Sequence, residues 1–166
     1  MLEIELNQTP GSVLPALVLG VGLGAFVDGI VLHQVLGWHH MLSNVHPAQG
    51  AEGLHFNMVW DGLFHVLAWI ATATGIVLLW RAGLEGRVPE VRRFAGALIT
   101  GFAAFNLVEG VIDHHLLKLH NVREVANPLP WNIGFLVVSS ALLVIGLALA
   151  QARRPLAMRL TGARQR

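Results

Sequence analysis

The sequence predicts an all-α protein, a four-helix transmembrane bundle built from two tandem helix-pair repeats. Of its 166 residues, 54% are hydrophobic and only 13% are charged, whereas soluble domains are about a quarter charged. The apolar residues fall into four long runs, and an acidic-glycine-histidine pattern occurs twice. A chain of this length is expected to form a single integral membrane domain over residues 1–166.

Each apolar run is long enough to cross about 30 Å of hydrocarbon at about 1.5 Å per residue. The runs must be helical, because separate segments can satisfy their backbone groups inside a bilayer only as helices. The first run resembles a signal peptide, but it lacks a basic start and carries Asp28 and His33 in its second half. We therefore expect helices at roughly 12–37, 57–80, 94–117 and 131–151.

The basic residues predict the orientation of these helices. Nine of the eleven lie between the second and third helices or in the C-terminal tail, and the loop from His39 to Phe56 has none. Cytoplasmic loops carry an excess of Lys and Arg. Both termini are therefore expected in the cytoplasm, with the histidine-rich helix ends on the outer side.

The doubled pattern relates the two halves of the chain. FVDGIVLHQVLGWHHM (residues 26–41) aligns without a gap to LVEGVIDHHLLKLHNV (residues 107–122). The alignment pairs Asp28 with Glu109, Gly29 with Gly110, His33 with His114 and His39 with His120. We expect two repeats, roughly 12–81 and 93–151, related by a two-fold axis along the membrane normal. Such repeats place their sites at the interface between the halves.

Helical geometry collects the polar side chains into a candidate site. At about 100° per residue, Asp28, His33 and His39 fall in one arc of the first helix, and their counterparts fall in a similar arc of the third. Asp61 and His65, four residues apart, share a face of the second helix. Gly29 and Gly110 would allow the first and third helices to approach closely. The candidate metal ligands are His33, Asp61, His65, Glu109, Asp113 and His114, with His39, His40 and His120 as secondary capture residues.

The residue types limit the chemistry of this site. Cysteine is absent, which excludes thiolate metal sites and iron–sulfur clusters. Imidazole with carboxylate suits zinc first, with iron or copper and a dinuclear centre as alternatives, while the neighbouring acids make haem a poorer fit. Buried carboxylates are costly in hydrocarbon, so Asp28 and Glu109 are the candidate catalytic groups. A carboxylate left uncoordinated would act as a general base.

The stretches GLGAFVDGIVLHQVLGWHHM, NMVWDGLFH and FNLVEGVIDHHLLKLH resemble an uncharacterised bacterial family of predicted four-helix integral membrane proteins. The resemblance covers roughly residues 15–150. It implies a bacterial inner membrane location, but no reaction. Members often lie near cytochrome oxidase assembly genes, which suggests copper or haem biology. This chain has Trp131-Asn132 where similar proteins tend to have Trp-Asp, so an acid that could be a ligand elsewhere is missing here.

Several functions remain open at this point. No HExxH, phosphate-binding loop or GxSxG motif is present. A membrane metalloenzyme, either a hydrolase or an oxidoreductase, is preferred. The alternatives are a copper capture or delivery protein linked to respiratory oxidase assembly, and a b-type haem or proton-relay subunit. The lipid bilayer is the expected partner, with a homo-oligomer or a respiratory-chain protein as further candidates, and the net charge of +1 gives no reason to expect nucleic acid.

Overall fold

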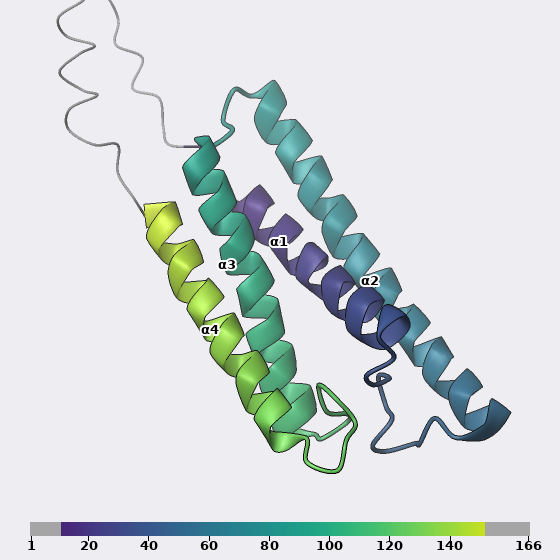
Figure 1. The fold of residues 1–166 in the computed structure, drawn as a ribbon. Coiled ribbons are helices and arrows are strands. Elements are labelled where there is room, and N and C mark those ends of the chain that lie inside the picture. The colour runs from purple at the N-terminus through teal and green to yellow at the C-terminus, as the bar shows by residue number, and fades with distance from the viewer. Residues whose placement is uncertain (1–10, 152–166) are drawn as a thin grey trace, which may run out of the picture.

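The computed structural model describes residues 11–151, and in this part of the chain it contains four long helices and no strand (Figure 1). Each helix is long and apolar enough to cross a membrane. The predicted all-α fold with four membrane-spanning helices is confirmed. The bounds are α1 Leu14–Val27 continuing as η1 Asp28–Val35, α2 Gly50–Leu84, α3 Val91–Glu109 continuing as η2 Gly110–Leu116, and α4 Leu129–Gln151.

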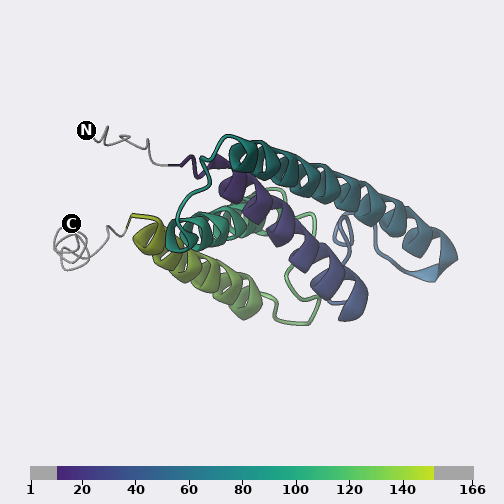
Figure 2. The ribbon, with the colours of Figure 1, turned by 90° about the horizontal axis from the view of Figure 1, so that it is seen from above.

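Helices α1 and α3 form the centre of the bundle, with α2 packed on α1 and α4 packed on α3 (Figures 1 and 2). Helices α1 and α3 approach closely because a glycine of each helix faces the backbone of the other. A Cβ added at Gly20 would lie 2.9 Å from the carbonyl carbon of Leu98, and one added at Gly101 would lie 2.9 Å from that of Leu17. Small residues allow this kind of close helix contact in membranes.

The expectation that Gly29 and Gly110 bring the first and third helices together is wrong. A Cβ at Gly29 would meet the rings of His65 and Phe64 on α2, and one at Gly110 would meet Phe135 and Leu136 on α4. These two glycines therefore make room for the partner helix of their own half. The close approach of α1 and α3 lies further from the histidines, at Gly20 and Gly101.

The distribution of polarity in the bundle is the reverse of that in a soluble protein. Its buried apolar side chains are mostly alanines, and its largest fully buried side chains are histidines, an asparagine, an aspartate and a serine. Large apolar side chains such as Leu67, Trp69, Val137 and Val144 are exposed on the outer helices α2 and α4. A lipid bilayer is the environment in which such a surface is stable.

Helix boundaries differ from the sequence-based estimates by up to seven residues. Helix α2 begins at Gly50, seven residues before the expected start at residue 57, and the first helix ends at Val35 rather than at residue 37. The early start is stabilised by Asn57, whose amide donates to the carbonyls of His46 and Gly53. Hydropathy locates the segment inside the membrane and does not report where a helix continues beyond it.

The loops 36–49 and 117–128 meet at one end of the bundle, at the lower right of Figure 1. The backbone amide of Asn44 donates to Leu119 at 2.9 Å, and that of Glu124 donates to Trp38 at 3.0 Å. The turn between α2 and α3 lies at the opposite end, near the start of α1. The histidine-rich segments of both halves are thereby brought together.

Candidate metal centre

Six acidic and imidazole side chains converge beneath the interleaved loops. They come from both halves of the chain and from both helices and loops, and each is buried. His39 and His120 are 1% exposed and Asp28 is 3% exposed. Groups of this kind are rarely removed from solvent without a partner or a metal. The six are Asp28, His33, His39, Glu109, His114 and His120.

Two π-helical segments, η1 and η2, align an acid with a histidine five residues later. In an α-helix, residues five apart lie about 140° apart around the axis, whereas a π-turn closes hydrogen bonds between residues i and i+5. Asp28 Oδ2 thus lies 3.2 Å from His33 Nε2, and Glu109 Oε1 lies 2.8 Å from His114 Nε2. The assumption of a regular α-helix through residue 37 is corrected here. Because the helix ends at Val35, His39 reaches the cluster from the loop.

The loop histidines are held by reciprocal hydrogen bonds between the halves. His39 donates from Nδ1 to the carbonyl of Val122, and His120 donates from Nδ1 to the carbonyl of Met41, both at 2.9 Å. The two imidazoles stack with their centroids 4.4 Å apart and their planes 4° apart. The residues involved, Met41 and Val122, are separated by the same 81 positions as the two histidines. The two-fold relation of the repeats 12–81 and 93–151 stays a prediction.

These hydrogen bonds determine which ring nitrogen faces the cluster. A carbonyl can only accept, so Nδ1 of His39 and of His120 carries the proton, and in the neutral ring Nε2 has a lone pair. His33 follows the same pattern, because its Nδ1 donates to Asp61 Oδ1 at 2.9 Å. Among the described residues Nε2 of His39 has no hydrogen-bond partner, and Nε2 of His33 faces Asp28 Oδ2 at 3.2 Å. Metal-binding histidines use their second nitrogen in the same way, as a donor to a carbonyl or carboxylate.

Two sets of three side chains are close enough to hold an ion. One ligand atom from each of His33, His39 and His120 lies within 4.8 Å of the other two, and the same is true of Glu109, His114 and His120. His120 belongs to both sets. Its Nε2 faces Glu109 Oε1 at 3.2 Å, and two acceptors at that distance require a proton or a cation between them. The donor set of imidazole and carboxylate without sulfur suits zinc, iron or Cu(II).

The structure places Asp61 behind His33 rather than beside the other ligands. Its Oδ1 accepts from His33 and from the backbone amide of Met41, and its Oδ2 accepts from His40 Nδ1 at 2.7 Å. His65 donates from Nδ1 to the carbonyl of Asp61 at 2.7 Å. Both oxygens of this carboxylate are therefore occupied by hydrogen bonds, and Asp61 orients His33 instead of facing the other candidate ligands. His40 and His65 lie outside the two sets of three.

The second half lacks an equivalent of this carboxylate. Asn132 accepts from the backbone amide of Val122 at 3.0 Å, as Asp61 accepts from that of Met41. However, Nδ1 of His114 has no partner in the structure. Asp113 is only half-buried and lies outside both sets of three. The two halves of the cluster therefore differ in how their helical histidines are held.

His39 is kept neutral by its surroundings. Its burial, together with the nearby His120 and His33, lowers the pKa of His39 well below its usual range. The imidazole of His114 also faces it, with centroids 6.1 Å apart. A neutral imidazole is the form that binds a metal. The sequence predicted His39 and His120 only as secondary capture residues. Their central position depends on hydrogen bonds to backbone carbonyls of the opposite loop, and no residue type in the sequence indicates such bonds.

Comparison with known proteins agrees with the architecture. A family model described as "Predicted membrane protein (DUF2243)" matches residues 15–153. The matched range includes all four helices and the six converging side chains. No curated protein and no solved structure shows a significant match to the chain.

Proposed function

We propose that this chain, which belongs to the DUF2243 family of predicted membrane proteins, is a membrane metalloprotein with its ion bound between the two halves. His33, His39 and His120 form the central imidazole set, and Glu109 and His114 extend it through the shared His120. One observation carries the proposal. Each of the three central imidazoles donates from Nδ1, so that three Nε2 lone pairs remain within a buried cluster.

Zinc is the first candidate for the ion, and iron or copper are the alternatives. Three imidazoles with nearby carboxylates are typical of zinc sites that keep a position open for water or substrate. The absence of cysteine disfavours Cu(I). The close stacking of His39 on His120, with centroids 4.4 Å apart, leaves no room for a porphyrin between these two rings.

An enzymatic role fits the free carboxylate oxygens of the site. Glu109 Oε2 and Asp28 Oδ1 are buried and have no hydrogen-bond partner. A carboxylate next to a metal centre can accept a proton as a general base. A bound zinc ion would supply Lewis acidity and activate water near neutral pH, and a redox metal would supply electron transfer. We therefore prefer a hydrolase or an oxidoreductase, and in either reaction Asp28 and Glu109 would move the proton.

Burial distinguishes this role from copper capture and delivery. All members of both sets of three are buried, so a bound ion would exchange slowly. A delivery protein needs an accessible site that releases its ion. Retention of the ion during prolonged dialysis against metal-free buffer is expected here, and rapid loss would favour delivery.

A metal-free proton relay is the second candidate, because one hydrogen-bonded series favours it. The half-exposed His40 donates to Asp61, Asp61 accepts from His33, and His33 faces Asp28 at 3.2 Å. This series would connect the loop surface with the buried carboxylate. Elemental analysis separates it from the metal proposal.

The orientation in the membrane is part of the proposal. Arg81, Arg87, Arg92 and Arg93 lie around the turn between α2 and α3, at the end of the bundle opposite the cluster. The excess of positive charge in cytoplasmic loops then places the cluster towards the outer side of the bacterial inner membrane. The C-terminal arginines that support the same orientation lie outside the described residues.

The test is elemental analysis of protein purified without added metal and without chelator. We expect one or two ions per chain in the wild type and a background level in His120→Ala, because His120 belongs to both sets. The exposed His55 provides the matched control, and His55→Ala should retain the wild-type metal content. His120→Gln, which keeps more of the side-chain volume, serves as a second variant if the alanine protein does not fold. Stoichiometric metal in a folded His120 variant, or none in the wild type, would contradict the proposal.

A further inference from the structure

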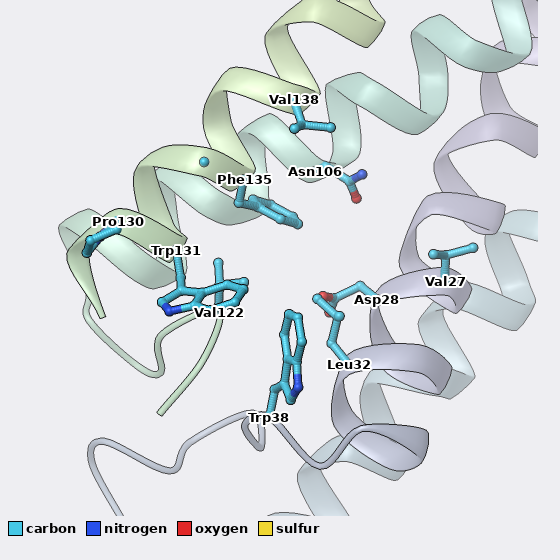
Figure 3. Close-up of a pocket in the computed structure, with 11 residues that line it drawn as sticks. Val27, Asp28, Leu32, Trp38, Asn106, Val122, Pro130, Trp131, Phe135 and Val138 are labelled. Carbon is cyan, nitrogen blue, oxygen red and sulfur yellow. The ribbon is translucent and has the colours of Figure 1, made fainter. Parts of the chain in front are cut away.

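A groove of about 410 Å³ opens on the side of the bundle between η1 and α4 (Figure 3). This volume lies within the range of small-molecule sites. Val27 and Val138 line the groove, and their side chains are exposed on the apolar surface of the bundle. In a membrane the groove is therefore open to lipid rather than to water.

The inner wall of the groove carries unpartnered hydrogen-bond acceptors. Asp28 and Asn106 are the two residues with polar side chains, other than tryptophan, among those that line it. Asp28 is 3% exposed and Asn106 is 7% exposed. Asp28 Oδ2 faces His33, but among the described residues Asp28 Oδ1 and Asn106 Oδ1 have no hydrogen-bond partner. Figure 3 shows the two side chains directed toward the same space. A buried acceptor without a partner is costly, so an occupant with hydrogen-bond donors would stabilise the groove.

Aromatic rings form the remaining walls. Trp38, Trp131 and Phe135 surround the space near the loop end (Figure 3). The two indoles pack edge to face with centroids 5.2 Å apart, and the guanidinium of Arg123 covers both, at 5.2 Å from Trp38 and 4.7 Å from Trp131. This end of the groove is suited to a flat aromatic ring, because aromatic pairs favour offset or edge-to-face contact.

We propose that this groove binds a membrane quinol, with its hydroxylated ring against the indoles and its isoprenoid tail leaving past Val27 and Val138. The two hydroxyls of a quinol can donate to Asp28 and to Asn106. An acyl chain of an ordinary lipid offers no donor and would leave these acceptors unpaired. An oxidised quinone offers only acceptors. It can accept from the Asn106 amide but cannot donate to the Asp28 carboxylate, so the groove favours the reduced form.

The groove shares Asp28 with the candidate metal centre, but binding there requires no bound ion. Asn106 belongs to neither set of candidate ligands, and Asp28 is not part of either set of three. The proposal can therefore be tested on metal-depleted full-length protein, which also prevents oxidation of the quinol by a bound redox ion. A failure of the metal proposal would leave this test unchanged.

The experiment measures binding of decylubiquinol and decylubiquinone to the purified protein in detergent, under argon, by quenching of tryptophan fluorescence. We expect the quinol to bind at least about tenfold more tightly than the quinone, since a lost hydrogen bond to a buried group costs about a factor of ten or more. Asn106→Leu should weaken quinol binding by about tenfold and reduce the difference between the two forms.

Glycines provide the matched pair of variants. A Cβ at Gly134 in the groove, or at Gly62 on the exposed face of α2, meets no atom within 4 Å. Gly134→Leu should fill the groove and weaken quinol binding by at least tenfold, while Gly62→Leu should leave it unchanged. Equal affinity for quinol and quinone would overturn the proposal, as would undiminished binding to Gly134→Leu. Equal binding of a decyl chain without the ring would assign the groove to a lipid acyl chain and would also overturn it.

Discussion

Replacing Gly20 with alanine tests how the central helix pair supports the site. The added Cβ would lie 2.9 Å from the carbonyl carbon of Leu98 and 2.9 Å from the backbone nitrogen of Phe102, and closer still to the Leu98 oxygen. Ordinary carbon contacts are about 3.5–4.0 Å, so α1 must move from α3 by at least about 0.6 Å. Because the obstacle is backbone, no side-chain rotation can relieve it.

The expected cost follows from this displacement. Overpacking of a well-packed interface costs about 1–3 kcal/mol, from which the helix-forming advantage of alanine over glycine, up to about 1 kcal/mol, must be subtracted. The displacement also separates Asp28 and His33 on the first helix from Glu109 and His114 on the third. Functional sites tolerate about 0.5 Å of misplacement, so metal affinity should fall by about tenfold or more.

The assay combines unfolding in mixed micelles with a metal competition titration. Gly62→Ala, where the added Cβ meets nothing within 4 Å, corrects for the intrinsic effect of alanine. Gly101→Ala should behave like Gly20→Ala, and the double variant should cost less than the sum, because both changes push the same two helices apart. A Gly20→Ala protein as stable and as metal-avid as Gly62→Ala would refute the reasoning.

Three further predictions concern the cluster and its orientation. Asp61→Asn should weaken metal binding about 10- to 100-fold by releasing His33, as measured by chelator competition, and unchanged affinity would remove Asp61 from the supporting role. The pKa of His39 is lowered by its burial, so protonation is tied to unfolding. The contribution of His39 to the stability of the metal-free protein should be complete above about pH 6.5 and fall by about 1.4 kcal/mol per pH unit below it. His39→Gln should reduce this slope, and an unchanged slope would assign it to another group. A periplasmic reporter should be active when fused within residues 36–49 and inactive within residues 85–90, and the reverse result would invert the proposed topology.

The predictable part of the site is the part encoded by spacing along the helices. The offset of 81 residues paired Asp28 with Glu109 and His33 with His114, and the structure buries all four in one cluster. The same offset also paired His39 with His120, although it gave no reason to place them at the centre. Their positions depend on hydrogen bonds to the backbone carbonyls of Val122 and Met41. Because every residue has a backbone carbonyl, the sequence does not indicate which ones will accept these bonds.

Regular helical geometry misled at the points where the helices change form. With α-helical geometry, residues five apart diverge, yet η1 and η2 bring the acid and the histidine of each half into contact. Asp61 and His65 share a face as expected, but hydrogen bonding turns them towards orienting contacts. A pattern of residue types does not distinguish a ligand from the residue that holds it.

The sequence alone determined that this is a four-helix membrane protein with polar groups near one end, because hydropathy and charge act locally along the chain. Only the tertiary structure decided which histidines meet, since His39 and His120 each donate to a carbonyl of the other loop, 83 and 79 positions away in the sequence. It also revealed the groove that Asp28 lines. Both features arise from contacts between distant segments, and such contacts form only when the glycine-lined helices α1 and α3 come together.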